Sequence, residues 1–174
     1  MNPYQRYVLP KMIDIACGMG AVMKLRAQIV SQATGEVLEI GIGSGLNLAF
    51  YDPNKVTSIT GVDPAAQMQA LARTRADGID IPVEIIAVDV HGIHAPSNRF
   101  DTIVMTFTLC SIADPIAALT EIARVLKPTG QLFFCEHGLA PDLTVERWQH
   151  RLTPLWTPLA GGCRLDRNIP ALLA

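Results

Sequence analysis

The apolar positions of the chain follow two patterns that alternate along its length. Short apolar runs typical of buried strands occur at residues 37–40, 57–62, 83–88, 100–106 and 131–136. Helical patterns lie between them at residues 65–75 and 115–125, and a helix of about two turns is expected to begin near Leu46. Strands that alternate with helices in this way predict a parallel sheet covered on both faces, the doubly wound α/β architecture.

Residues 1–34 precede the first strand and carry a helical pattern of their own. Apolar residues recur there at Met12, Ile13, Ala16, Met19 and Met23. One interpretation is a helix that packs on the domain. The other is a helical lid over a substrate cavity, in which Tyr4 and Tyr7 supply flat apolar walls and two glycines permit a hinge. We divide the chain accordingly into a lid, residues 1–34, and a ligand-binding domain, residues 35–174.

Composition narrows the classes of protein to consider. The 174 residues suit one globular domain, with 49% hydrophobic and 17% charged residues. The formal charge is −2 and no basic run occurs, which disfavours a nucleic-acid partner. No signal peptide is expected, and the apolar stretch from Val8 to Met23 is interrupted by Pro10, Lys11 and Asp14, so we expect no insertion into a membrane.

The cysteines give no sequence signature of a metal site. Cys17, Cys110, Cys135 and Cys163 are far apart in the chain and form no C-x-x-C pair. We therefore expect neither metal ligation nor a disulfide framework, and the plain interpretation is a protein of the reducing cytoplasm.

A glycine-rich turn follows the first predicted strand. The stretch is Glu39-Ile40-Gly41-Ile42-Gly43-Ser44-Gly45. Glycine accepts positive φ and lets a ligand lie against the backbone, while the amides at a following helix N-terminus favour a negatively charged group. Leu46 stands where the nicotinamide dinucleotide fingerprint needs a glycine or alanine, so that fingerprint fits less well. A structural strand–helix turn and another nucleotide fold remain alternatives at this point.

Two carboxylates follow the next two strands. Asp63 stands about 20 residues past the glycines, where a carboxylate reaches ribose hydroxyls. It is also suited to cap the next helix, with Pro64 at the first helical position. Asp89 and the Val90 amide end the third strand and either read the polar edge of an adenine ring or merely begin a turn.

Several motifs together resemble the class I S-adenosylmethionine-dependent methyltransferases. The glycine-rich stretch resembles their motif I, written E/D-x-G-x-G-x-G. Further resemblance lies in Arg99-Phe100-Asp101, in 106–111, in 121–130, in Phe134-Cys135-Glu136-His137 and in 148–167. These segments are similar to the small-molecule branch that includes the methyltransferase-like thiol methyltransferases and relatives of ubiquinone-biosynthesis enzymes. The resemblance covers nearly the whole chain and implies a Rossmann-like fold.

The resemblance implies S-adenosylmethionine as cofactor and a set of residues that would bind it. Glu39 would lie beneath the methionine part, Asp63 would hold the ribose, and Asp89 with its neighbour would hold the adenine. Thr106 would lie by the sulfonium region, and Asn47 is a weaker candidate. The full cofactor set is Glu39, Gly41, Gly43, Ser44, Gly45, Asn47, Asp63, Pro64, Asp89, Val90 and Thr106.

The acceptor implied by the resemblance is a small, apolar molecule such as a thiol. Methyl transfer from a sulfonium needs mainly positioning and desolvation, so the lack of a catalytic triad is no objection. His137 follows the fifth strand and is either a general base or a satisfied loop histidine. Cys110 either lines the acceptor pocket, with Tyr4 and Tyr7, or is a buried loop cysteine. The N-P-P-[YFW] motif of amino-methylating enzymes does not follow the fourth strand.

Two alternatives to a methyltransferase stay open. One is a nicotinamide oxidoreductase on the same fold, and the other is a non-catalytic protein that binds the cofactor or a partner. The usual methyltransferase fold ends in two further strands, for which residues 161–174 are too few. A sheet without that hairpin exposes the fifth strand, Gln131 to Glu136, and favours a homo-oligomer through this edge. The alternative is a tail, Leu152 to Ala174, that folds back across it.

Overall fold

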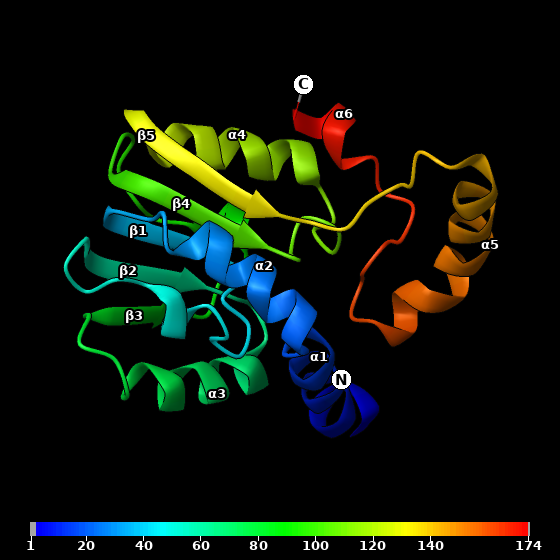
Figure 1. Ribbon diagram of the computed structural model, residues 1–174, viewed down its shortest axis with the longest axis horizontal. Coiled ribbons are helices and arrows are strands. Elements are labelled where there is room, and N and C mark those ends of the chain that lie inside the picture. Colours follow the sequence, from blue (N-terminus) through cyan, green and yellow to red (C-terminus); the bar gives the residue numbers. More distant parts are fainter. Residues whose placement is uncertain (1–2, 174) are drawn as a thin grey trace.

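The computed structural model describes residues 3–173 and contains one parallel five-stranded sheet with helices on both faces (Figure 1). The strand order is β3-β2-β1-β4-β5, and every neighbouring pair is parallel. The strands are β1 (Gly35–Ile40), β2 (Val56–Val62), β3 (Val83–Ile86), β4 (Phe100–Thr106) and β5 (Leu126–Cys135). This arrangement confirms the predicted doubly wound α/β fold, whose order reverses between β1 and β4.

The helices divide between the two faces of the sheet and a separate C-terminal segment (Figure 1). They are α1 (Leu9–Cys17), α2 (Gly20–Val30), α3 (Ala66–Ala76), α4 (Pro115–Val125), α5 (Leu143–Leu159) and α6 (Ile169–Leu173). A π-helical turn, η1 (Tyr4–Val8), precedes α1, and Figure 1 shows α5 standing away from the sheet. No helix within residues 3–173 is long and apolar enough to cross a bilayer.

Successive side chains of β1 point to opposite faces of the sheet and pack into two separate hydrophobic cores. Val37 packs with Val30 of α2 and Ala72 of α3 on one face. Leu38 packs on the other face with Ile122 of α4 and Ile169 of α6. A strand buried on both faces must be apolar at successive positions, which is why the strands of this chain are recognisable as continuous apolar runs.

The connection after β1 differs from the prediction. The expected two-turn helix is only a single 3-10 turn, η2 (Leu48–Phe50), because the preceding Asn47 turns its side chain into the interior, where it is 1% exposed. The predicted cap of α3 is also wrong. Ala65 is the N-cap and Pro64 precedes it, while Asp63 accepts a hydrogen bond from the Ala65 amide (2.8 Å).

Other boundaries follow the turn chemistry of the sequence. Asp114 caps α4 by accepting from the Ala117 amide (3.0 Å), as predicted. The N-terminal helical pattern breaks at Gly18, between α1 and α2. The fifth strand begins earlier than predicted: Leu126 pairs with Phe100, and after a shift of register the regular pairing resumes at Gln131.

Strand β5 forms an edge of the sheet in the described chain. Its one strand neighbour is β4, and Phe134 is 39% exposed. The tail does not fold back over this edge: the buried Ile169 of α6 joins the core beside α4 instead. The prediction that the tail covers the edge is therefore wrong, and the edge of the apolar strand stays open to other chains.

Candidate cofactor and acceptor cavity

A cavity of about 790 Å³ lies at the carboxyl ends of the central strands. It is bounded by the glycine-rich loop after β1, by Asp63 after β2, by Asp89 beyond β3 and by Thr106 at the end of β4. Ligands of open parallel sheets bind at this edge, where the strand order reverses. The volume is in the range of pockets for small organic ligands.

The glycine-rich loop approaches the cavity with its backbone. Gly43 has φ +56°, and a Cβ there would meet only Met68 and Gly41 at ordinary contact distances, so the space over this residue is open. Gly45, at φ +80°, faces the other way: a Cβ there would lie 3.0 Å from the Ala72 backbone. Gly43 thus serves the cavity, while Gly45 permits close packing on α3.

Asp63 joins the loop to the end of β2. Its two carboxylate oxygens accept from the Gly43 amide (3.0 Å) and the Ala65 amide (2.8 Å), and the residue lines the cavity. Burial raises the pKa of Asp63, while the two amides oppose that shift. Each carboxylate oxygen has a second lone pair, so the group can still accept from a diol.

The sequence left two roles open for Asp89, the start of a turn and a contact to a ligand. It begins the 3-10 turn η3 (Val90–Gly92), where Oδ1 accepts from the amides of His91 (3.0 Å) and Gly92 (3.2 Å). Asp89 and Val90 also line the cavity. The turn is therefore confirmed and holds Asp89 at the cavity, while the adenine contact stays a prediction.

A buried hydrogen-bond network lies beneath the part of the cavity that Arg26 and Thr106 line. Arg26 donates from Nη1 to Asn47 Oδ1 (2.9 Å) and to Thr106 Oγ1 (2.6 Å). Asn47 Nδ2 donates to Glu39 Oε1 (3.0 Å), and Tyr51 donates to Glu39 Oε2 (2.8 Å). Of this set, Arg26 and Thr106 line the cavity, whereas Glu39 and Asn47 lie behind it.

Arg26 is the site residue that the sequence analysis missed. It is 6% exposed and lies with its guanidinium 5.0 Å from the centre of the Phe107 ring. Its Nε is buried without a hydrogen-bond partner among the described residues, which is costly for a charged donor. The only signal in the sequence was a basic residue within an apolar helical stretch, which a solvated helix face also produces.

Glu39 is almost fully buried, at 1% exposed. Burial raises its pKa to about 7, and the hydrogen bonds from Tyr51 and Asn47, with the Arg26 charge, oppose that shift. Its carboxyl group is therefore a support for the network rather than a direct lining group. A direct contact of Glu39 with a ligand in the cavity is not supported, because Asn47 and Arg26 lie on the hydrogen-bond path between them.

The N-terminal segment closes the cavity on its open side. Leu9, Pro10 and Ile13 supply apolar wall. A polar contact ties α1 down: Asp14 pairs with Arg75 of α3 (2.9 Å) and accepts from the Ser44 hydroxyl (2.5 Å). Ser44 thus links the glycine-rich loop to α1.

The predicted aromatic walls are not part of the cavity. Neither Tyr4 nor Tyr7 lines it, and Tyr7 is 60% exposed. Tyr4 instead donates to the Leu159 carbonyl at the end of α5 (2.6 Å), which joins the N-terminal segment to the C-terminal one. The helical spacing of apolar residues correctly predicted a helix in this segment, but it did not indicate which turn faces the cavity.

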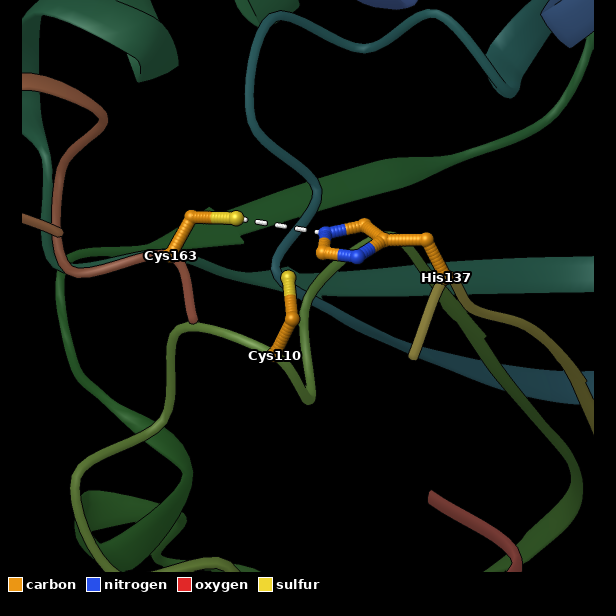
Figure 2. Close-up of side chains that lie close together, drawn as sticks. All are labelled: Cys110, His137 and Cys163. Atoms are coloured by element: carbon orange, nitrogen blue, oxygen red, sulfur yellow. Dashed lines mark hydrogen bonds between the residues drawn. The ribbon is translucent and has the colours of Figure 1, made fainter. Parts of the chain in front are cut away.

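His137 and Cys110 also lie outside the cavity lining, and Cys163 joins them (Figure 2). His137 Nε2 is 3.2 Å from Cys163 Sγ, and this contact raises the pKa of His137 despite its partial burial. Hydrogen bonding to Cys110, and then to His137, lowers the pKa of the Cys163 thiol. The geometry does not support His137 as a general base or Cys110 as an acceptor contact, because both face each other and Cys163.

Comparison with known proteins identifies the family. The family described as methyltransferase domain matches residues 38–134. Thiol S-methyltransferase TMT1B of Rattus norvegicus is 36% identical over 136 residues, covering 76% of this chain and 55% of the relative. The ubiquinone/menaquinone biosynthesis C-methyltransferase UbiE of Bdellovibrio bacteriovorus is 32% identical over 111 residues, covering 62% and 46%. The chain spans about half the length of these curated relatives.

A solved structure supports the same fold. The S-adenosylmethionine-dependent methyltransferase from Thermotoga maritima, described as a possible histamine N-methyltransferase, has a TM-score of 0.67 at 22% identity. The alignment covers 98% of this chain and 76% of that one. The family match runs from β1 into β5, over more than half of the chain, and so the chain belongs to the methyltransferase domain family, for which S-adenosylmethionine is the cofactor.

Proposed function

We propose that this chain transfers a methyl group from S-adenosylmethionine to the sulfur of a small, apolar thiol. The observation that carries the proposal is one cavity that joins a glycine-rich loop, two strand-end carboxylates and a buried arginine to an apolar wall from α1. The thiol S-methyltransferase relative supports sulfur as the accepting atom.

The donor groups around the cavity match the parts of this cofactor. Arg26 presents a buried cation and an unsatisfied Nε, which suit the methionine carboxylate. Asp63 would accept from the ribose hydroxyls, and the Asp89–Val90 turn would meet the adenine edge. Over Gly43 the space is open for backbone approach. The remaining implied contacts, Gly41, Ser44, Pro64 and Thr106, also line the cavity.

Methyl transfer from a sulfonium requires little of the protein beyond correct placement of the cofactor and the acceptor. When bound, the cofactor supplies a methyl group on a positively charged sulfonium, which a nucleophile takes by in-line displacement. Leu9, Pro10 and Ile13 would exclude water and hold an apolar acceptor in line. A thiol ionises with a pKa of about 8.5, so part of it is already thiolate near neutral pH. Among the described residues, the apolar wall from α1 carries no imidazole, and the histidine that lines the cavity, His91, follows Asp89 in η3. A thiol acceptor, which needs no strong base, fits this arrangement.

The lid in this proposal is shorter than the first 34 residues. Helix α2 contributes Val30 to the core and Arg26 to the network, so it belongs with the ligand-binding domain. The segment η1–α1 (residues 4–17) is the part that closes over the cavity and would control entry of the acceptor.

The test uses pairs of acceptors that differ in one atom. The reduced chain is incubated with methyl-labelled S-adenosylmethionine and with small apolar thiols or alcohols of the same carbon skeleton. We expect label on the thiol sulfur and none on the alcohol. Labelled alcohols or amines without labelled thiols would overturn the thiol assignment. Cofactor binding without transfer to any acceptor would favour the non-catalytic alternative.

We further propose that the chain does not bind nucleic acid. We also propose that it functions in a reducing compartment, in the simplest case the cytoplasm. The net charge of −2 supports the first proposal. Four free thiols among the described residues support the second. A filter-binding assay with duplex DNA and RNA should give no retention at physiological salt.

A further inference from the structure

Three metal-ligating side chains from distant parts of the chain meet outside the cavity (Figure 2). They are Cys110 from the loop after β4, His137 from the loop after β5, and Cys163 from the turn after α5. Their ligand atoms all lie within 4.8 Å of one another. Figure 2 shows both sulfur atoms and the imidazole ring directed toward a common point. We call these residues the Cys2His cluster.

The loops that carry the Cys2His cluster are held in place by independent contacts. Glu136 Oε1 accepts from the Thr108 amide (2.6 Å) and the Leu109 amide (2.8 Å), immediately before Cys110. Arg167 Nη1 donates to the Leu109 carbonyl (2.8 Å) and the Ile112 carbonyl (2.6 Å), on either side of it. The position of Cys110 is thus fixed from both directions before any ligand binds.

The third member is brought in by the C-terminal segment. The Arg164 amide donates to the Cys110 carbonyl (3.1 Å), which places the turn after α5 directly on the Cys110 loop. The Leu139 amide donates to the Arg167 carbonyl (2.8 Å), which brings together the two ends of the segment 139–167 that contains α5. We call this segment the α5 excursion. Within this excursion, α5 itself stands away from the sheet (Figure 1).

From this arrangement we infer that the Cys2His cluster is a binding site for one soft divalent cation of the zinc type. Two sulfurs and one imidazole nitrogen are ligands that zinc prefers. Tetrahedral coordination, with Zn–S about 2.3 Å and Zn–N about 2.0–2.1 Å, sets such atoms roughly 3.5–3.8 Å apart. Since no two ligand atoms are more than 4.8 Å apart, no separation has to shorten by more than about 1.3 Å to reach that spacing. Water would fill the fourth position.

The bound cation would fasten the C-terminal segment to the sheet. Its ligands come from the loops after β4 and β5 and from the far end of the α5 excursion, so coordination closes the excursion onto the carboxyl end of the sheet. Cys110 and Cys163 would bind as thiolates and His137 as neutral imidazole, so binding releases the protons these groups hold. Two thiolates and a divalent cation leave the site neutral overall.

Cobalt and zinc test the inference directly on the full chain under a thiol-free reductant. Co²⁺ is titrated into metal-free protein, and zinc affinity is measured by competition with a chromophoric chelator. We expect one ion per chain and a sulfur-to-cobalt charge-transfer band with the strong visible bands of a tetrahedral site. Absence of the charge-transfer band in the wild-type chain would overturn the inference, whatever the variants do.

Single cysteine variants separate the cluster from ordinary thiols. Cys163→Ser should lose the charge-transfer intensity of one sulfur and weaken zinc binding by roughly 100-fold or more, because losing a ligand costs at least as much as losing its outer partner. Cys135→Ser is the matched control, a half-buried free thiol on β5 outside the cluster, and should bind like wild type. Circular dichroism checks that each variant is folded. Equal loss in both variants would contradict the assigned ligands.

Discussion

At the scale of single residues, Arg26 is the group on which the proposed recognition of the cofactor carboxylate depends. A guanidinium offers a planar fork of donors, whereas a lysine ammonium offers a point charge. Arg26→Lys should therefore weaken S-adenosylmethionine binding about 10-fold, the loss of roughly one charge-assisted hydrogen bond. Calorimetry with decarboxylated S-adenosylmethionine supplies the control, because that analogue lacks the carboxylate and should bind both proteins alike. Equal weakening of both ligands would remove Arg26 from carboxylate recognition.

Asp63 carries the ribose assignment. Asp63→Ala should weaken cofactor binding by about 1–3 kcal/mol, because charge-assisted hydrogen bonds are lost and the Gly43 amide loses its acceptor. Asp80→Ala, an exposed aspartate outside the cavity lining, is the matched control and should bind normally. Unchanged affinity for the Asp63 variant would show that the ribose is held elsewhere.

The raised pKa of Glu39 predicts how the free energy of unfolding depends on pH. Its pKa is about 7 in the folded protein against an ordinary value of 4.5. Between these values the folded chain keeps a proton that the unfolded chain has released, so the free energy of unfolding falls as the pH rises through this window. The loss amounts to about 3 kcal/mol at 1.36 kcal/mol per unit of pKa.

Glu39→Gln isolates this contribution from other titrating groups. Chemical denaturation of both proteins at several pH values from 5 to 8 should show the wild type losing stability relative to the variant as the pH rises. Among the described residues, Glu39 is the carboxyl group of this hydrogen-bond network, and the nearby Asp63 carboxylate, which also raises the pKa of Glu39, is present in both proteins. Two parallel curves would mean that Glu39 is ionised throughout the range.

The sequence predicted many residues of the site but not how they divide between lining and support. Strand-end positions indicated Asp63 and Asp89, since parallel strands end at one edge of a sheet. Arg26 and the Cys2His cluster could not be found in this way. Their partners are separated by long stretches of chain, and only the folded packing of α2 and of the C-terminal turns brings them together.

At the scale of secondary-structure elements, the proposed lid depends on the contact between α1 and the glycine-rich loop. Asp14 pairs with Arg75, and this pair lowers the pKa of Asp14. Both side chains are partly exposed, so the pair is worth at most about 1 kcal/mol. Asp14→Asn should leave the fold intact but open α1 more often.

Hydrogen exchange measured by mass spectrometry checks this prediction. Peptides from residues 9–17 of Asp14→Asn should exchange several-fold faster, up to about fivefold for a loss of 1 kcal/mol. Peptides from β1 and β4 should be unchanged. Glu121→Gln breaks a comparable ion pair with Arg124 away from the cavity and is the control. If α1 exchanges at the wild-type rate in the Asp14 variant, another contact holds it.

Element boundaries were predictable where local chemistry decides them. Asp114 and Pro115 set the start of α4, and β4 has the predicted bounds Phe100–Thr106. The missing helix after β1 was not predictable, because its loss follows from the buried bonds of Asn47 to Glu39 and Thr106. Tertiary contacts there override local helix propensity.

At the scale of the whole molecule, the open edge of β5 predicts self-association. Its apolar side chains include Phe134, which is 39% exposed, and no strand of the described chain pairs beyond it. Light scattering over a range of concentrations should show a dimer at high concentration. Phe134→Lys should shift that equilibrium toward monomer, because a charged edge residue opposes strand pairing. A wild-type monomer at every concentration would contradict the prediction.

The central claim is that the cavity at the carboxyl ends of the sheet binds S-adenosylmethionine. Isothermal titration calorimetry of the reduced chain with this cofactor, and with NAD in a parallel titration, tests it most directly. We expect one binding site per chain for S-adenosylmethionine, competition by its demethylated product, and no heat with NAD. Binding of NAD, with no binding of S-adenosylmethionine, would contradict it.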